Sequence, residues 1–212
     1  MGSLPAPKHY WNFDEGSGTQ AKDASGRLGV SLERPAWAQG KWGKALRLHP
    51  EEGVPQVHLS TADQTPPWTV ALWVKREAES EASSLLSSST HALRLEQWPS
   101  KHTLGITHFG VADWDFGYEA PLQQWVHVAV VGTASDTRLY VNGKQQGSIS
   151  QALPLPLQWI GSAPESSERA RACIDELRIY DTALTESQLQ ELSKLDPTPP
   201  PPPPQKNSRR RR

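Results

Sequence analysis

The sequence predicts an all-β fold, a sandwich of two antiparallel sheets with one short helix near the C-terminal end. Short runs rich in β-branched and aromatic residues recur between turn signals, and this spacing is typical of sandwiches and barrels. A second observation is the alternating run CIDELRIY at residues 173–180, which leads directly into a short helical pattern. The predicted strands are residues 9–13, 29–32, 44–48, 56–59, 68–75, 83–88, 92–97, 103–109, 116–119, 124–131, 137–141, 157–160 and 171–180.

One β-hairpin is predicted with particular clarity. Residues 138–141 and 144–147 are strand-like and are joined by Asn142-Gly143. Asn and Gly take the two positive φ angles of a type I′ turn at low cost, so this pair favours a tight two-residue connection.

The predicted helix covers residues 185–192. Thr185 is a suitable N-cap, and Gln188 three residues later completes a capping box. An apolar stripe of Leu184, Leu189 and Leu192 indicates that one face of this helix packs on the sandwich.

The composition changes near residue 196, which predicts three parts. Residues 1–7 are expected to be a flexible N-terminus, residues 8–195 the folded domain, and residues 196–212 a disordered tail rich in proline and arginine. The tail holds five basic residues and one acidic residue, so the net charge of −1 leaves about −5 on the rest of the chain. This balance disfavours a nucleic-acid groove in the domain. The arginine run is compatible with phosphates or an acidic surface, although a solvated tail is the simpler interpretation.

The single cysteine and the hydropathy pattern give little information on the compartment. Cys173 lies in an apolar strand, where a buried and inert thiol is expected. The first thirty residues contain no signal-peptide-like apolar run, and no stretch approaches the ~20 apolar residues needed for a membrane span.

Eight segments in order resemble a known family: WNFDEGSG, DASG, GKAL, WTVALWV, QWVHVA, LYVNG, IG and IDELRIY, which begin at residues 11, 23, 43, 68, 124, 139, 160 and 174. Together they are similar to the laminin G-like, concanavalin A-like lectin/glucanase superfamily. The resemblance implies a jelly roll, often an ancillary domain of secreted glycoside hydrolases and adhesins, and therefore an extracellular or cell-surface location. It also implies carbohydrate binding and, in many members, a structural Ca²⁺ ion.

A calcium site is predicted where the two ends of the domain meet. Asp175 shares a strand face with the apolar residues Cys173, Leu177 and Ile179, so its carboxylate is expected to turn toward the core and to need compensation. Asp14, Glu15 and Asp23 lie in a glycine-containing loop that the fold brings near this strand. These four carboxylates are the predicted Ca²⁺ ligands. The alternative is a hydrogen-bonded Asx turn at Asp23 with no metal.

Some of the nine tryptophans are candidates for a sugar platform, because aromatic faces stack on pyranose rings. Trp11, Trp73 and Trp125 are expected to pack in the core. Trp114 lies between two acids in a loop-like stretch, which makes it a candidate sugar platform. The alternative is a loop tryptophan that folds down over the edge of the sheet. The predicted ligand-binding residues are Trp114, Asp113, Asp115, His108 and Trp98.

Catalysis is not expected. The glucanase pattern Glu-x-Asp-x-x-Glu is absent, although Asp113 and Asp115 share part of its spacing. The strand Arg94-Leu95-Glu96 resembles one half of a polysaccharide-lyase motif, but the second half has the wrong spacing. Two functions therefore stay open: a glycan-binding module beside a catalytic domain, or a structural or protein-interaction domain of a larger extracellular protein.

Overall fold

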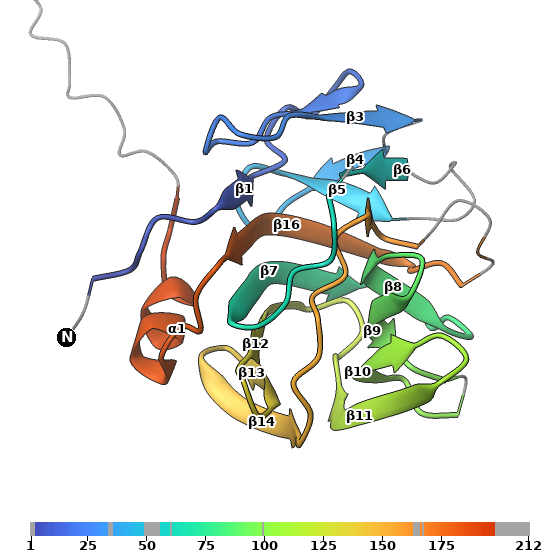
Figure 1. Ribbon diagram of the computed structural model, residues 1–212. Helices are drawn as coiled ribbons and strands as arrows, with labels where there is room; N and C mark the ends of the chain where they lie inside the picture. Colours follow the sequence, from blue (N-terminus) through green and yellow to red (C-terminus); the bar gives the residue numbers. More distant parts are fainter. Residues whose placement is uncertain are drawn as a thin grey trace, which may run out of the picture.

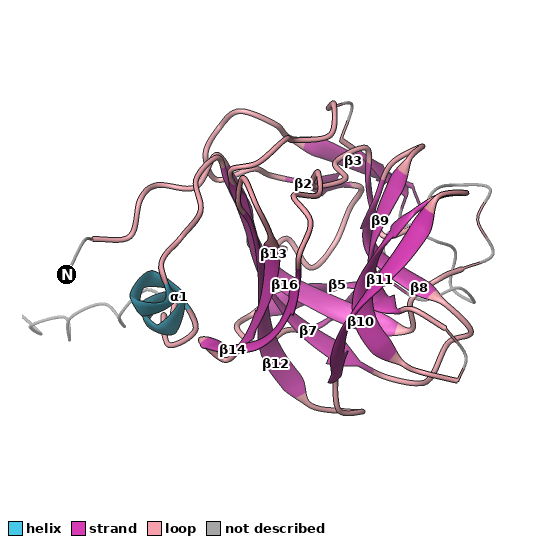
Figure 2. Ribbon diagram, turned by 60° about the horizontal axis from the view of Figure 1, so that its bottom comes forward, coloured by secondary structure: helices cyan, strands magenta, loops and turns pink. Residues whose placement is uncertain are grey.

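The computed structural model describes residues 3–33, 36–48, 56–59, 61–98, 100–162, 166 and 168–197. Two antiparallel sheets of eight strands each pack face to face (Figures 1 and 2). The first sheet runs in the order β14 (Lys144–Ile149), β13 (Thr137–Val141), β12 (Trp125–Gly132), β7 (Trp68–Arg76), β16 (Ala172–Tyr180), β5 (Lys44–Leu48) and β4 (Ala36–Gln39), and β1 (His9–Trp11) pairs with β16. The predicted all-β sandwich is confirmed.

The second sheet contains the other eight strands. Its order is β11 (Ala112–Glu119), β10 (Thr103–His108), β9 (His91–Glu96), β8 (Ser83–Ser87), β15 (Trp159–Ile160), β6 (Gln56–His58), β3 (Val30–Glu33) and β2 (Gln20–Ala21). Because side chains of a strand alternate between faces, each inward apolar residue leaves its neighbours on the outer face of the sheet.

The core lies between the two sheets. Val70, Leu72 and Val74 of β7 point into it, as do Leu93 and Leu95 of β9, and all five are fully or almost fully buried. Complete burial of such a side chain stabilises a fold by about 1.5–3 kcal/mol. Trp11 also lies in this core, as predicted.

Two other tryptophans, which were predicted to pack in the core, lie on the outer face of the first sheet, where Trp73 is nevertheless buried. Trp73 alternates with the apolar residues of β7 and packs against His127 on the outer face of the first sheet, with 5.4 Å between ring centroids. Trp125 is partly exposed, and the Lys75 ammonium lies 5.5 Å from its ring centroid.

The first and last strands of the domain lie side by side, as predicted (Figure 1). His9 to Trp11 pair with Leu177 to Ile179, and the Tyr10 hydroxyl donates a 2.7 Å hydrogen bond to Glu176. Arg178 lies under the Tyr10 ring at 4.1 Å from its centroid. These contacts join the two ends of the domain.

Strand β16 departs from the predicted alternation. Glu176 has a φ of 55°, and the pairing with β7 shifts register between Asp175 and Arg178. This bulge lets Ile174 and Leu177 both reach the core. Asp175 consequently shares the outer face with its pairing partner Trp73, which corrects the expectation that it shares the face of Leu177 and Ile179.

Helix α1 (Glu186–Leu192) covers part of the outer face of the first sheet (Figure 2). Thr185 is the N-cap and forms the predicted capping box with Gln188. Leu189 and Leu192 are buried against a second apolar cluster that includes Tyr140 and Tyr180. No helix among the described residues has the length and apolar character required to cross a membrane.

Three further predictions concern the hairpin turn, the single cysteine and the two ends of the chain. Asn142 and Gly143 have φ angles of 49° and 79°, so the predicted hairpin turn is confirmed. Cys173 is buried and free, and burial raises the pKa of its thiol to about 12. Most of the predicted tail, from residue 198 onward, and the first two residues of the predicted N-terminus lie outside the described residues.

Candidate functional site

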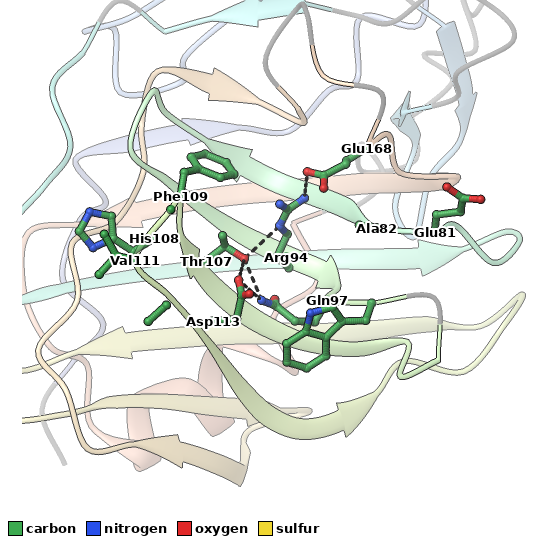
Figure 3. A pocket seen from close by; sticks show the side chains of 13 residues that line it. Glu81, Ala82, Arg94, Gln97, Thr107, His108, Phe109, Val111, Asp113 and Glu168 are labelled. Atoms are coloured by element: carbon green, nitrogen blue, oxygen red, sulfur yellow. Dashed lines mark hydrogen bonds and ion pairs between the residues drawn. The ribbon is translucent and has the colours of Figure 1, made fainter.

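A cleft of about 590 Å³ opens on the outer face of the second sheet (Figure 3). This volume is within the range of ligand sites in proteins, about 300–1,000 Å³. Strands β9, β10 and β11 form its floor, and two other segments close its side. The lining residues are Glu81, Ala82, Arg94, Gln97, Trp98, Thr107, His108, Phe109, Gly110, Val111, Ala112, Asp113 and Glu168.

The strand register brings the polar floor together. Arg94 lies between the core residues Leu93 and Leu95, so its side chain points outward. Thr107 is the Cα partner of Asp113 across β10 and β11. Three neighbouring strands thus contribute one polar group each to the same surface.

Arg94 is almost completely buried, with 4% of its surface exposed, and its guanidinium is held on two sides. Its Nε donates to the Thr107 hydroxyl at 3.3 Å, and its Nη1 donates to the Ser84 hydroxyl at 3.3 Å. Nη1 also lies 2.6 Å from the Glu168 carboxylate. A buried cation requires such partners, and together they fix the position of the guanidinium in the cleft.

Asp113 is held by two neutral donors. The Thr107 hydroxyl donates to its Oδ1 at 2.7 Å, and the Gln97 amide donates to the same oxygen at 3.0 Å. Gln97 also donates to the Thr107 hydroxyl at 2.8 Å. A Cβ at Gly105 would clash with the Trp114 backbone oxygen and would lie 2.6 Å from the Gln97 Oε1, so the close approach of these strands needs glycine at this position. Oδ2 of Asp113 is left for contacts from the exposed side of this residue.

Apolar surface lies beside these polar groups. Phe109 is 41% exposed, and its ring centroid lies 5.6 Å from the Arg94 guanidinium carbon. Val111 is 68% exposed, and Trp98 is partly buried at the cleft wall. Figure 3 shows the Phe109 ring near the upper end of the Arg94 side chain and Asp113 below, next to Thr107 and Gln97. The cleft therefore combines an exposed aromatic ring with fixed hydrogen-bonding groups.

Three of the five predicted ligand-binding residues line this cleft: Asp113, His108 and Trp98. The His108 ring stacks on His91 at 4.1 Å between centroids, at the edge of the group formed by Arg94 and Asp113 (Figure 3). Asp115 is outside the lining, and its carboxylate accepts a 2.6 Å hydrogen bond from the Gly117 backbone.

Trp114 does not enter the cleft. The stretch predicted as a loop is the first half of strand β11, and Trp114 pairs with the core residue Ile106. Its partly buried side chain packs against the main core, on the face opposite to Asp113. The prediction of a loop platform at this residue is therefore wrong in its geometry.

Several lining residues were missed by sequence reasoning, above all Arg94, Gln97, Thr107, Phe109 and Glu168. The run HALRLE contained a signal for Arg94, because a charged residue between two leucines in a strand must face away from the core. Glu168 carries no such signal, since it reaches Arg94 from a connection 74 residues further along the chain.

The predicted metal ligands are engaged by separate hydrogen-bond donors. Asp23 accepts bonds from the His9 ring at 2.9 Å and from the backbone amides of Tyr10, Ser25 and Leu28 at 2.8–3.0 Å. Burial alone would raise the pKa of Asp23, but the bonds from Ser25, His9 and the backbone outweigh burial and lower it. This is the Asx turn of the alternative interpretation.

Asp14 and Glu15 accept bonds elsewhere. Asp14 accepts the Lys44 amide at 2.8 Å, and Glu15 accepts the Lys22 amide at 2.8 Å. Asp175 is fully buried and accepts the Trp42 amide at 3.0 Å. Trp42 lies in the connection between β4 and β5, outside the loop of residues 14–26 that was expected beside this carboxylate.

Burial raises the pKa of Asp175 to about 7, although the Trp42 amide opposes this shift. Within the described ranges, no group of three or more His, Cys, Asp or Glu residues is arranged to hold a metal ion. The four carboxylates are thus not drawn together as one ligand set, and calcium binding stays a prediction.

Solved structures with the same fold come from several kinds of protein. Domain 4 of AbnA, a GH43 extracellular arabinanase from Geobacillus stearothermophilus, in complex with arabinotriose, is similar with a TM-score of 0.65 and 23% identity over 89% of this chain and 98% of that one. The binding domain of Paraclostridial Mosquitocidal Protein 1 has a TM-score of 0.63 and 14% identity, covering 87% of this chain and 51% of that one.

A Trypanosoma rangeli sialidase has a TM-score of 0.63 and 11% identity, and the match covers 90% of this chain and 33% of that one. These likenesses concern the fold. Comparison with curated proteins found no similar sequence. Residues 53–190 match the family model described as concanavalin A-like lectin/glucanases superfamily. With the jelly-roll sandwich described above, this match shows that the chain belongs to the concanavalin A-like lectin/glucanase superfamily.

Proposed function

We propose that this chain is a non-catalytic carbohydrate-binding module and that the cleft on β9, β10 and β11 holds the glycan. The observation that carries the proposal is that Asp113, fixed by Thr107 and Gln97, lines the same cleft as the exposed ring of Phe109. A sugar ring needs an apolar surface for its C–H face and rigid polar groups for its hydroxyls. This cleft offers both.

The proposed role of each residue follows from those of its polar atoms for which no hydrogen bond is described above. Oδ2 of Asp113 accepts a hydrogen bond from a sugar hydroxyl, and Nη2 of Arg94 donates to a neighbouring hydroxyl. Phe109 and Trp98 provide the aromatic surface. Because Arg94, Thr107 and Gln97 hold one another, little conformational entropy is lost when the ligand binds.

The fold neighbours support this proposal. The arabinanase domain was solved with a bound arabinotriose, and this chain covers nearly all of that domain. We infer the same arrangement here: a module outside the cell that keeps a neighbouring catalytic domain near its substrate by raising the effective concentration.

A direct test is a glycan array followed by calorimetric titration of the oligosaccharides that bind. The proposal expects affinities in the micromolar to millimolar range that fall at least about tenfold in Asp113→Ala. Glu191→Ala on helix α1 is the control, since this residue lies on the opposite side of the sandwich. An array without any bound glycan would favour the other function, a domain that uses Phe109 and Val111 to contact protein.

A further inference from the structure

We propose that the cleft selects uncharged glycan segments and excludes acidic ones, and that Glu81 and Asp113 determine this selectivity. The inference rests on the proposed glycan binding and adds the chemical class of the ligand. It depends on the charges of the described residues that line the cleft. The one permanent cation among them is already paired with a carboxylate, so the charges that remain for a ligand are negative.

Of the described residues that line the cleft, Arg94 alone carries a permanent positive charge, against the carboxylates of Glu81, Asp113 and Glu168. The Arg94 charge is already compensated, because its Nη1 lies 2.6 Å from the Glu168 carboxylate. Arg94 therefore serves a ligand as a hydrogen-bond donor and supplies no net charge.

The other two carboxylates have no cation of their own. Asp113 is bonded by the neutral groups Thr107 and Gln97, and no described residue forms an ion pair with Asp113 or Glu81. Arg169 and Arg171 line a neighbouring hollow of about 380 Å³ that Glu81 and Glu168 also line. The carboxylates of Asp113 and Glu81 therefore line the cleft without an ion pair to a described residue, and a bound ligand meets their negative charges.

A carboxylate on the ligand would meet these charges at close range. Two like charges a few ångströms apart at a protein surface repel strongly enough to weaken binding by about tenfold or more. A neutral sugar with two neighbouring hydroxyls meets an acceptor at Asp113 and a donor at Arg94 without this penalty. The arrangement thus fits a neutral diol better than a uronate.

The test compares one glycan with its own oxidised form. The neutral oligosaccharide that binds best is oxidised at its primary hydroxyl to a carboxylate, and both forms are titrated calorimetrically at low salt. We expect the oxidised form to bind about tenfold more weakly, with a smaller difference in 1 M NaCl, where the Debye length is about 3 Å.

Protein variants identify the residue responsible. Glu81→Gln should narrow the affinity ratio of neutral to oxidised ligand by at least about threefold. Glu191→Gln on helix α1 removes the same charge on the opposite side of the sandwich and should leave the ratio unchanged. Because each ratio is measured on a single variant, a general loss of binding or folding cancels from it.

The result that would contradict the proposed selectivity differs from the result that would contradict glycan binding itself. Equal or tighter binding of the oxidised form overturns the selectivity while glycan binding stands. The same holds for a ratio that Glu81→Gln and 1 M NaCl leave unchanged. If neither form binds, the proposed function itself is wrong, and this inference falls with it.

Discussion

The Thr107 hydroxyl donates a 2.7 Å hydrogen bond to Oδ1 of Asp113, from the residue that pairs with it across β10 and β11. This bond orients the one carboxylate that we expect to contact the glycan. Thr107→Val keeps the shape of the side chain but removes the donor, so glycan affinity should fall about tenfold. Thr107→Ser keeps the hydroxyl and should retain the affinity within about threefold. Calorimetric titration checks both, and equal losses in the two variants would show that the hydroxyl has no role.

Phe109 is the expected stacking surface, and Leu122 provides a matched control. The two side chains are 41% and 40% exposed, but only Phe109 lines the cleft. Phe109→Ala should weaken glycan binding about tenfold, because aromatic contacts contribute about 0.5–1.5 kcal/mol beyond the buried area. Leu122→Ala should leave the affinity unchanged. Similar effects of both changes in the same titration would argue against stacking at Phe109.

Trp114 should stabilise the folded domain, whereas Trp98 should stabilise the complex with glycan. Trp114 packs against the core, so Trp114→Ala should lower the free energy of unfolding by roughly 2–4 kcal/mol. Trp98 lies at the cleft wall, so Trp98→Ala should mainly lower glycan affinity. Urea denaturation and titration of each variant separate these effects. A stable Trp114→Ala variant that no longer binds glycan would show that Trp114 belongs to the binding site.

The sandwich was predictable because its signals are local. Alternation in residues 173–180, the Asn142-Gly143 turn and the cap at Thr185 each lie within a few neighbouring residues. The bulge at Glu176 was not predictable, since a positive φ at a glutamate has no composition signal. It moved Asp175 to the outer face, and with it changed the residue that donates to its carboxylate.

The candidate site was harder to predict from the sequence, for a related reason. Asp113 and His108 were found because they are close in sequence to an aromatic residue. The partners that orient Asp113 come from other strands, and only the register of β9, β10 and β11 brings Arg94 and Thr107 beside it. Trp114 was misplaced because the acids on both sides of it suggested a loop, whereas residues 112–119 form the edge strand β11.

The calcium prediction can be tested by chelation. Oδ1 of Asp175 is buried and has no hydrogen-bond partner among the described residues, which leaves one oxygen that an ion would satisfy. Bound calcium would make the melting temperature fall in EGTA and recover with added CaCl₂, and Asp175→Asn would abolish this response. Calorimetric scans measure it. A melting temperature that EGTA does not change would reject the metal.

His127 makes the domain sensitive to acid. Its side chain is buried, its Nδ1 has no partner among the described residues, and burial, with Arg178 nearby, lowers its pKa from 6.5 to about 3. The unfolded chain therefore binds a proton between these values that the folded domain does not. The stability contributed by the neutral ring is complete above pH 6.5 and is lost as the pH falls toward 3, by roughly 3–5 kcal/mol.

Asp175 has the opposite effect on stability. Burial raises its pKa from 3.8 to about 7, so its contribution is complete below pH 3.8 and is lost as the pH rises through 7. The curve of the unaltered protein mixes the two groups, and a variant is needed to separate them. His127→Phe keeps a ring against Trp73 and cannot be protonated, so its free energy of unfolding should decline less between pH 6.5 and 3. Urea denaturation across this range measures both slopes, and parallel curves would mean that His127 is protonated as readily in the folded domain as in the unfolded chain.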